Sequence, residues 1–171
     1  LAIPRPKNLP TVLGIDEYKG NAGGQVYQVI ITDIRNHSIV DILPKRDTNA
    51  LIQYFSSFSR KARKQVTYII MDMSPLFKLV MQTMFPHAHI VADRYHVCRL
   101  VDWAVERVRK REQKILVVHS KMLKHNRRIL MKNPDRLTES EQIKLQEILR
   151  ISDDLRIAYG LRLAFRKIFK I

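Results

Sequence analysis

The first half of the chain begins with short apolar runs that are rich in β-branched residues. These runs predict strands at residues 11–16, 25–32 and 38–43. The polar link at 33–37 is short enough for a hairpin, and the glycines of 20–24 suit a turn between the first two strands. The chain is therefore expected to open with three consecutive strands.

The pattern then alternates between helices and strands. Asp47 or Thr48 can cap a helix that reaches about residue 58. Residues 65–71 and 88–92 are apolar runs typical of buried strands. The helix predicted between them is defined by a cap at Ser74, by Pro75 and Pro86 at its ends, and by an apolar stripe of Leu76, Leu79, Val80 and Met84.

The strand pattern stops after Asp93, and only helical periodicity follows. The first two predicted helices cover residues 97–118 and 121–131. A third begins at the capping box of Thr138 and Glu141. A fourth begins at Ser152 or Asp153 and is interrupted or ended near Gly160. The sequence thus predicts an α/β domain over residues 1–93 and a helical region over residues 94–171.

Composition limits the classes of protein that remain. The hydrophobic share of 46% and the charged share of 27% are typical of a folded domain. No apolar stretch approaches the ~20 residues of a membrane helix, and the proline-rich start does not resemble a signal peptide. Cys98 is the single cysteine, which excludes an internal disulfide and fits a reducing cytoplasm. Because Leu1 is not methionine, we expect an excised piece of a longer protein.

Basic residues outnumber acidic residues by 31 to 16, for a formal charge of +15. Residues 94–132 hold 12 of the 31 basic but only 3 of the 16 acidic side chains. Such a segment is either a surface that contacts DNA phosphates or simply a solvated helix face. The candidate DNA-binding residues are Arg94, Arg99, Arg107, Arg109, Lys110, Arg111, Lys114, Lys121, Lys124, Arg127 and Arg128.

Two acids stand where apolar strands are expected to end. Asp16 is the last residue of the first predicted strand, and Asp72 follows the run at 65–71. If the two strands are neighbours, their carboxylates can converge on divalent cations such as Mg²⁺, which prefer oxygen ligands. The alternative is a turn or helix-cap role, which is a strong competitor for Asp72 because Ser74 and Pro75 follow it.

Three segments carry a resemblance to a known family. They are LGIDEYKG at 13–20, IIMDMSPLFK at 69–78 and FPHAHIVADRYHVCRLVDWAVERVRK at 85–110. In this order they resemble the catalytic region of insertion-sequence transposases, specifically the ISL-three group of DDE transposases. The resemblance implies an RNase H-like fold, with a mixed five-stranded sheet flanked by helices and a helical insertion after it.

The same resemblance implies roles for individual residues. Asp16 matches the first catalytic aspartate and Asp72 the second, both as metal ligands. Asp93 is a further candidate ligand, a group that orients its neighbours, or a cap of the following helix. The family's third acid, a glutamate, is expected beyond Ile171, because the available acids lack its surrounding motif; these are Glu141, Glu147, Asp153 and Asp154. The fragment is therefore expected to be inactive alone.

The mechanism that the resemblance implies uses two Mg²⁺ or Mn²⁺ ions to cut and join double-stranded DNA at the ends of a mobile element. The partners implied are DNA and further copies of the chain, with no membrane. The alternatives are an RNase H-like nuclease or resolvase that does not join strands, and a non-catalytic basic DNA-binding module. A zinc site is disfavoured because the histidine spacings match no closed zinc pattern, and Cys98 is expected to be a core thiol rather than a nucleophile.

Overall fold

The computed structural model describes residues 8–20 and 26–169. The chain divides into two compact units, Leu1–His96 and Val97–Ile171. The turn expected at the glycines of 20–24 lies mostly outside the described residues. Among the described residues, no helix is long and apolar enough to cross a lipid bilayer.

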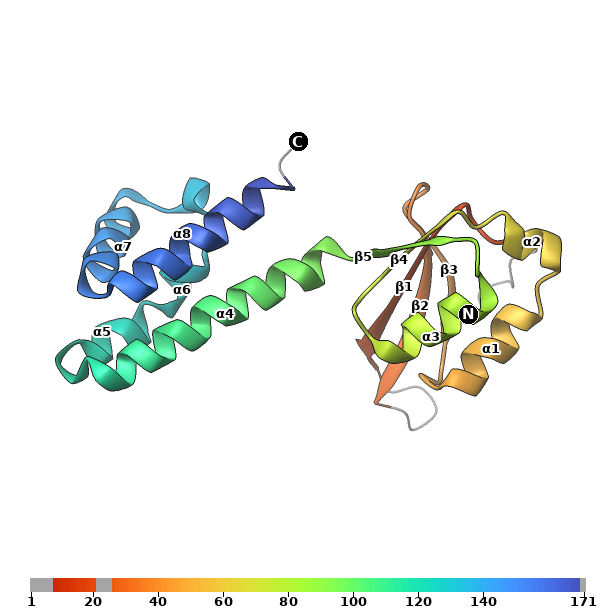
Figure 1. Ribbon diagram of the computed structural model, residues 1–171, viewed down its shortest axis with the longest axis horizontal. Coiled ribbons are helices and arrows are strands. Elements are labelled where there is room, and N and C mark those ends of the chain that lie inside the picture. Colours follow the sequence, from red (N-terminus) through yellow and green to blue (C-terminus); the bar gives the residue numbers. More distant parts are fainter. Residues whose placement is uncertain (1–7, 21–25, 170–171) are drawn as a thin grey trace. The chain divides into compact units, whose positions relative to one another are not determined.

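The first unit is built on a mixed five-stranded sheet with the order β3-β2-β1-β4-β5 (Figure 1). Strands β1 and β2 are antiparallel, as are β2 and β3, whereas β4 and β5 add in parallel to β1. This confirms the predicted RNase H-like α/β fold. The strand bounds are β1 Val12–Lys19, β2 Tyr27–Asp33, β3 Ser38–Leu43, β4 Tyr68–Met71 and β5 His89–Ala92.

Strand β1 is longer than its apolar pattern indicates. It pairs with β2 from Leu13 opposite Asp33 to Lys19 opposite Tyr27. Asp16 therefore lies within β1, opposite Ile30, and the expectation that it ends the strand is wrong. The physical reason is that the antiparallel partner continues the ladder of hydrogen bonds past the acid, whatever the polarity of the side chains.

Helices cover one face of this sheet. They are α1 Thr48–Ser56, α2 Arg60–Lys64 and α3 Pro75–Met84. The predicted cap of α1 is confirmed, since the Asp47 carboxylate accepts a 2.8 Å hydrogen bond from the Ala50 amide. The core of the first unit joins sheet and helices through fully buried side chains, among them Leu13, Ile69, Leu51, Phe55, Phe77 and Val80.

Two expectations about burial in this unit are wrong. Helix α3 buries Phe77, Val80 and Met81, whereas Leu79 of the predicted stripe is 59% exposed. Strand β5 is largely exposed rather than buried. It stands at the edge of the sheet, where only β4 covers it from the side, so apolar character alone does not bury Val91.

The second unit is helical. Its helices are α4 Arg94–Ile115, α5 Ser120–His125, α6 Arg127–Met131, α7 Glu139–Ile151 and α8 Asp153–Lys167, with short 3₁₀ turns η2 Val117–His119 and η3 Pro134–Arg136. Its own core centres on Leu123, Leu130, Ile148 and Leu155, all fully buried. The first turn of α4 belongs to the first unit, which ends at His96.

The capping residues predicted in this unit are confirmed, but the extents of three helices differ. The helix expected at 97–118 is α4, which begins at Arg94 and ends at Ile115. Thr138 and Glu141 form a reciprocal capping box, and the Ser152 hydroxyl caps α8. The helix expected at 121–131 is divided into α5 and α6 at Asn126, whose side-chain amide donates to the Met122 carbonyl at 2.9 Å. Helix α8 runs through Gly160 without a break.

Candidate active site

Three aspartates follow equivalent positions on three neighbouring strands. Ile15 of β1 pairs with Met71 of β4, and Met71 pairs with Ala92 of β5. The next residue on each segment is an aspartate, namely Asp16, Asp72 and Asp93. Successive residues of a strand alternate between faces. Because Ile15 is buried in the core, the alternation of β1 places Asp16 on the opposite face of the sheet, whereas Asp72 and Asp93 lie just beyond the ends of β4 and β5.

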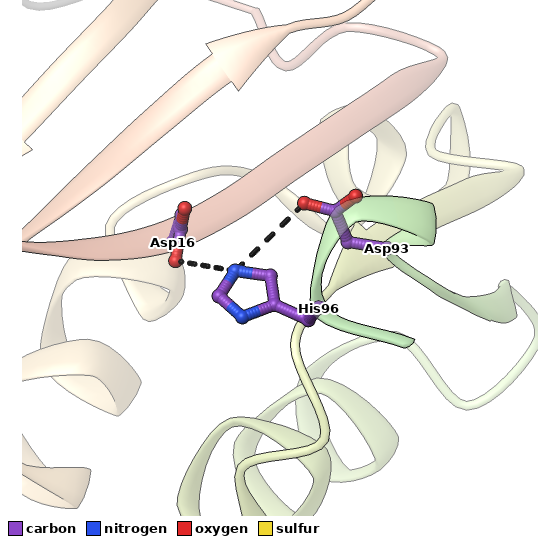
Figure 2. A group of neighbouring side chains, drawn as sticks. All are labelled: Asp16, Asp93 and His96. Carbon is purple, nitrogen blue, oxygen red and sulfur yellow. Dashed lines mark ion pairs between the residues drawn. The ribbon is translucent and has the colours of Figure 1, made fainter. Parts of the chain in front are cut away.

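Asp16, Asp93 and His96 form a compact group on this face (Figure 2). One ligand atom from each side chain lies within 4.8 Å of the other two. The Nε2 atom of His96 is 3.5 Å from Oδ1 of Asp16 and 3.9 Å from Oδ2 of Asp93. The imidazole is 11% exposed, whereas the two carboxylate side chains are 45% and 34% exposed, so a ligand can reach them from solvent.

The backbone around Asp93 explains why this group forms. The Asp93 amide donates a 2.7 Å hydrogen bond to the Met71 carbonyl, which continues the pairing of β5 with β4. Its carboxylate accepts from the Tyr95 amide at 2.8 Å and so caps the start of α4. The cap role expected as one alternative is thus present. It also places His96 in the first turn of α4, three residues after Asp93 and on the same side as that carboxylate.

Asp72 has a different local environment. Its Oδ1 accepts a 2.9 Å hydrogen bond from the Ser74 amide, which is the turn role expected as the alternative. The Ser74 hydroxyl in turn accepts from the Arg46 guanidinium at 3.3 Å, and Arg46 is ion-paired with Glu17 of β1. Asp72 is not a member of the group of three, although its strand lies between those of Asp16 and Asp93. A shared ion between Asp16 and Asp72 remains a prediction.

The donor atoms of the group fit a divalent cation. Carboxylate oxygens suit Mg²⁺ and Mn²⁺, and a neutral imidazole nitrogen is a better ligand for Mn²⁺ and later transition metals than for Mg²⁺. From the sequence alone, His96 was not assigned to the metal site. The available signal was the spacing of three between an aspartate that caps a helix and a histidine in the first turn.

Comparison with known proteins identifies the family. A family model for DDE transposases of the ISL-three (ISL3) group, described as a transposase, matches residues 13–171. The chain belongs to this transposase family. It is also similar to the transposase for insertion sequence element IS1001 of Bordetella parapertussis, with 25% identity over 142 residues. The match covers 81% of this chain and 35% of the relative, so the chain spans about a third of that protein's length.

The predicted basic surface of this transposase chain is exposed, with one exception. All of the candidate DNA-binding side chains from Arg94 to Arg128 are exposed apart from Arg109. Arg109 is 4% exposed, and its guanidinium donates to Glu106, to Gln113 and to the Leu123 carbonyl. It is therefore unsuitable for contact with DNA, because its donors neutralise a neighbouring carboxylate and satisfy a buried carbonyl group.

Ion pairs within the transposase chain neutralise some of the exposed cations. Arg111 pairs with Glu112 and with Asp154, and Arg127 pairs with Glu106. The arginines beside Glu106 hold the pKa of that carboxyl below its ordinary value, mainly through the hydrogen bond from Arg109. These pairs leave the lysines of α4 and α5 as the more available cations on this surface.

Proposed function

We propose that this chain provides the metal-binding part of a transposase active site that cuts and joins double-stranded DNA at insertion-sequence ends. The observation that carries the proposal is the convergence of Asp16, Asp93 and His96 within 4.8 Å in a chain of the transposase family. Asp72, which follows the intervening strand β4, is proposed to contribute to this site as well. The whole protein is proposed to act as a homo-oligomer on DNA in the cytoplasm.

Each residue has a defined task in this proposal. Asp16 and Asp72 hold divalent ions, as the catalytic aspartates of the family do, and Asp93 supplies a further carboxylate. His96 stands between Asp16 and Asp93 and fixes their spacing or adds a nitrogen ligand. The bound ions would supply activation of the attacking hydroxyl and stabilisation of the leaving oxygen.

Exposed lysines and arginines of the helical unit are proposed to bind the DNA backbone. Contacts of this type position the duplex without reading its sequence. They also release counterions, so the logarithm of the binding constant should fall in proportion to the logarithm of the salt concentration. The proposed set is the predicted one without Arg109, since that side chain is buried.

Divalent-ion binding is the direct test of the site. The chain should bind Mn²⁺, as measured by electron paramagnetic resonance, and Asp16→Asn or Asp93→Asn should weaken binding by about tenfold or more. Glu147→Gln changes an exposed acid of α7 and should leave Mn²⁺ binding unchanged. If both aspartate variants bind Mn²⁺ like the unaltered chain, the proposed site is wrong.

Activity is tested in the complete transposase. Asp16→Asn and Asp72→Asn should abolish strand cleavage while DNA binding and folding persist, and Glu147→Gln should cleave normally. Strand joining with a pre-cleaved DNA end then separates a transposase from a nuclease. Cleavage without joining would support the nuclease alternative, and undiminished cleavage by either aspartate variant would contradict the catalytic assignment.

A further inference from the structure

The link between α4 and α5 exposes three aliphatic side chains that the proposed active site does not use. Ile115 is 63% exposed, Val117 is 76% exposed and Val118 is 92% exposed. These three residues, which lie where α4 ends and η2 begins, are called the apolar tip below. Three exposed aliphatic side chains within four residues differ from scattered single exposed residues, because they present apolar area in one short segment where a ligand can cover it.

The tip is held by the backbone rather than being a loose loop. The Leu116 amide donates to the Glu112 carbonyl at 2.8 Å, and the His119 amide donates to the Leu116 carbonyl at 3.0 Å. Leu116 itself is partly buried. The turn η2 therefore keeps Leu116 toward the protein and directs Val117 and Val118 outward.

Cations flank the tip on both sides. Between residues 110 and 124 the sequence holds five lysines and arginines but one acid, Glu112. Glu112 is 7% exposed and bonded to Ser152 and Arg111, so it contributes little negative charge at the surface. Lys114 precedes the tip and Lys121 follows it, both exposed. A ligand complementary to this surface is a polyanion that also offers apolar faces.

We propose that the apolar tip of Ile115, Val117 and Val118 inserts between DNA bases while the flanking lysines bind the adjacent phosphates. DNA has both required features, since its backbone is anionic and an opened base step exposes apolar base faces. Aliphatic wedges of this type partly unstack a step and kink the duplex. The proposal rests on the proposed function and deepens it, because it specifies a distorted rather than a straight duplex as the form that is bound.

An anionic membrane is the competing ligand for a basic surface with apolar residues. A helix that lies on a bilayer uses an apolar face along its length. Here the three aliphatic residues of the tip lie within residues 115–118, and exposed lysines lie on both sides of them along the chain. This arrangement favours insertion at a single point between two phosphate-binding segments.

The test uses duplex DNA that carries 2-aminopurine, whose fluorescence rises when the base is unstacked. The chain should raise the fluorescence and should prefer a duplex with one mismatched step, because opening that step requires less energy. The double variant Val117→Asn with Val118→Asn should lose the fluorescence change and the preference for the mismatch. Both side chains are exposed, so the fold should persist, which circular dichroism checks. Ile143→Asn is the matched control, since this residue of α7 is 58% exposed and lies outside the tip.

The outcomes separate this proposal from the proposed function. Salt-dependent DNA binding by both the unaltered chain and the double variant, with identical fluorescence, would overturn the wedge and leave the basic DNA-binding surface intact. Failure of the unaltered chain to bind DNA would contradict both. Binding to vesicles of anionic phospholipid that the double variant loses, with unchanged behaviour toward DNA, would assign the tip to a membrane and also overturn the wedge.

Discussion

Nε2 of His96 lies 3.5 Å from Oδ1 of Asp16, so a side chain of the turn that follows the last strand lies beside the first strand of the sheet. In the proposed metal site, this relationship would add a nitrogen donor to ligands that the aspartates alone would make entirely of oxygen. The choice of metal ion should therefore depend on the histidine as well as on the acids.

We expect the chain to bind Mn²⁺ more tightly than Mg²⁺, and His96→Asp to reduce the ratio of the two affinities by about tenfold. The physical reason is that a carboxylate suits Mg²⁺, whereas an imidazole favours the transition metal. Competition between the two ions, followed by electron paramagnetic resonance of Mn²⁺, measures the ratio. His125→Asp changes an exposed histidine outside the group and should leave the ratio as it is. If the unaltered chain, His96→Asp and His125→Asp all showed the same ratio of Mn²⁺ to Mg²⁺ affinity, His96 would be excluded as a ligand.

Gly14 is required by the close approach of β1 and β2. A Cβ atom at this position would lie 2.2 Å from Oγ1 of Thr32 and 2.7 Å from Cδ1 of Ile34. Gly14→Ala should therefore lower the free energy of unfolding by about 1–3 kcal/mol, the usual effect of overpacking. Urea unfolding followed by circular dichroism measures it.

Gly160 provides the opposite case. A Cβ atom there would meet nothing within 4 Å, and the residue lies inside α8. Gly160→Ala should raise the free energy of unfolding by about 0.5–1 kcal/mol, because alanine loses less conformational entropy in a helix. The same urea unfolding experiment measures it.

A second substitution at Thr32 tests the prediction for Gly14. Thr32→Ala combined with Gly14→Ala should recover part of the stability lost at Gly14. If Gly14→Ala were as stable as the unaltered chain, the strand packing described for this position would be wrong.

Arg109 and Lys110 are neighbours with opposite expected roles. Arg109→Ala should reduce the stability of the helical unit by about 1–3 kcal/mol, because it leaves the Leu123 carbonyl without this donor and Glu106 with Arg127 as its remaining ion-pair partner. Lys110→Ala should leave stability unchanged. It should reduce by about one the number of counterions released on DNA binding, which is measured as the slope of the logarithm of the binding constant against the logarithm of the salt concentration. Thermal unfolding and salt titration of DNA binding distinguish the two. A stable Arg109→Ala protein with a reduced salt slope would return Arg109 to the DNA-binding set.

Glu141 should make the helical unit sensitive to acid. The hydrogen bond from Lys132, followed by that from the Thr138 amide, holds the pKa of this carboxyl below its ordinary value of 4.5. A lowered folded-state pKa contributes stability that is present above pH 4.5 and is lost as the pH falls through the folded-state value. Glu141→Gln should therefore destabilise the chain at pH 7, and this difference should shrink below pH 4.5. Denaturant unfolding at a series of pH values tests it. Glu147→Gln is the control, and a pH-independent effect of Glu141→Gln would contradict the assignment.

The local sequence was sufficient for several elements of the fold. The alternation from Ser38 to Leu43 predicted β3 with its observed bounds, and the residues that cap α1, α7 and α8 were identified correctly. These features depend on interactions between residues close in the chain, such as a side-chain oxygen and an amide three residues later. For the same reason the turn at Asp72 and the cap at Asp93 were available as alternatives from sequence alone.

Contacts between distant segments decided the rest. Pairing with β2 carries β1 beyond Asp16, and the edge position leaves β5 exposed. Packing against α5 buries Arg109, although the basic segment around it predicted a side chain that contacts DNA. The group of Asp16, Asp93 and His96 likewise exists only because parallel pairing aligns β1, β4 and β5 and the cap at Asp93 brings His96, in the first turn of α4, beside Asp16. The hydrophobic periodicity of the sequence indicates which residues lie on the same face of one helix or strand. The pairing of strands and the packing of helices in three dimensions determine which of these faces contact one another.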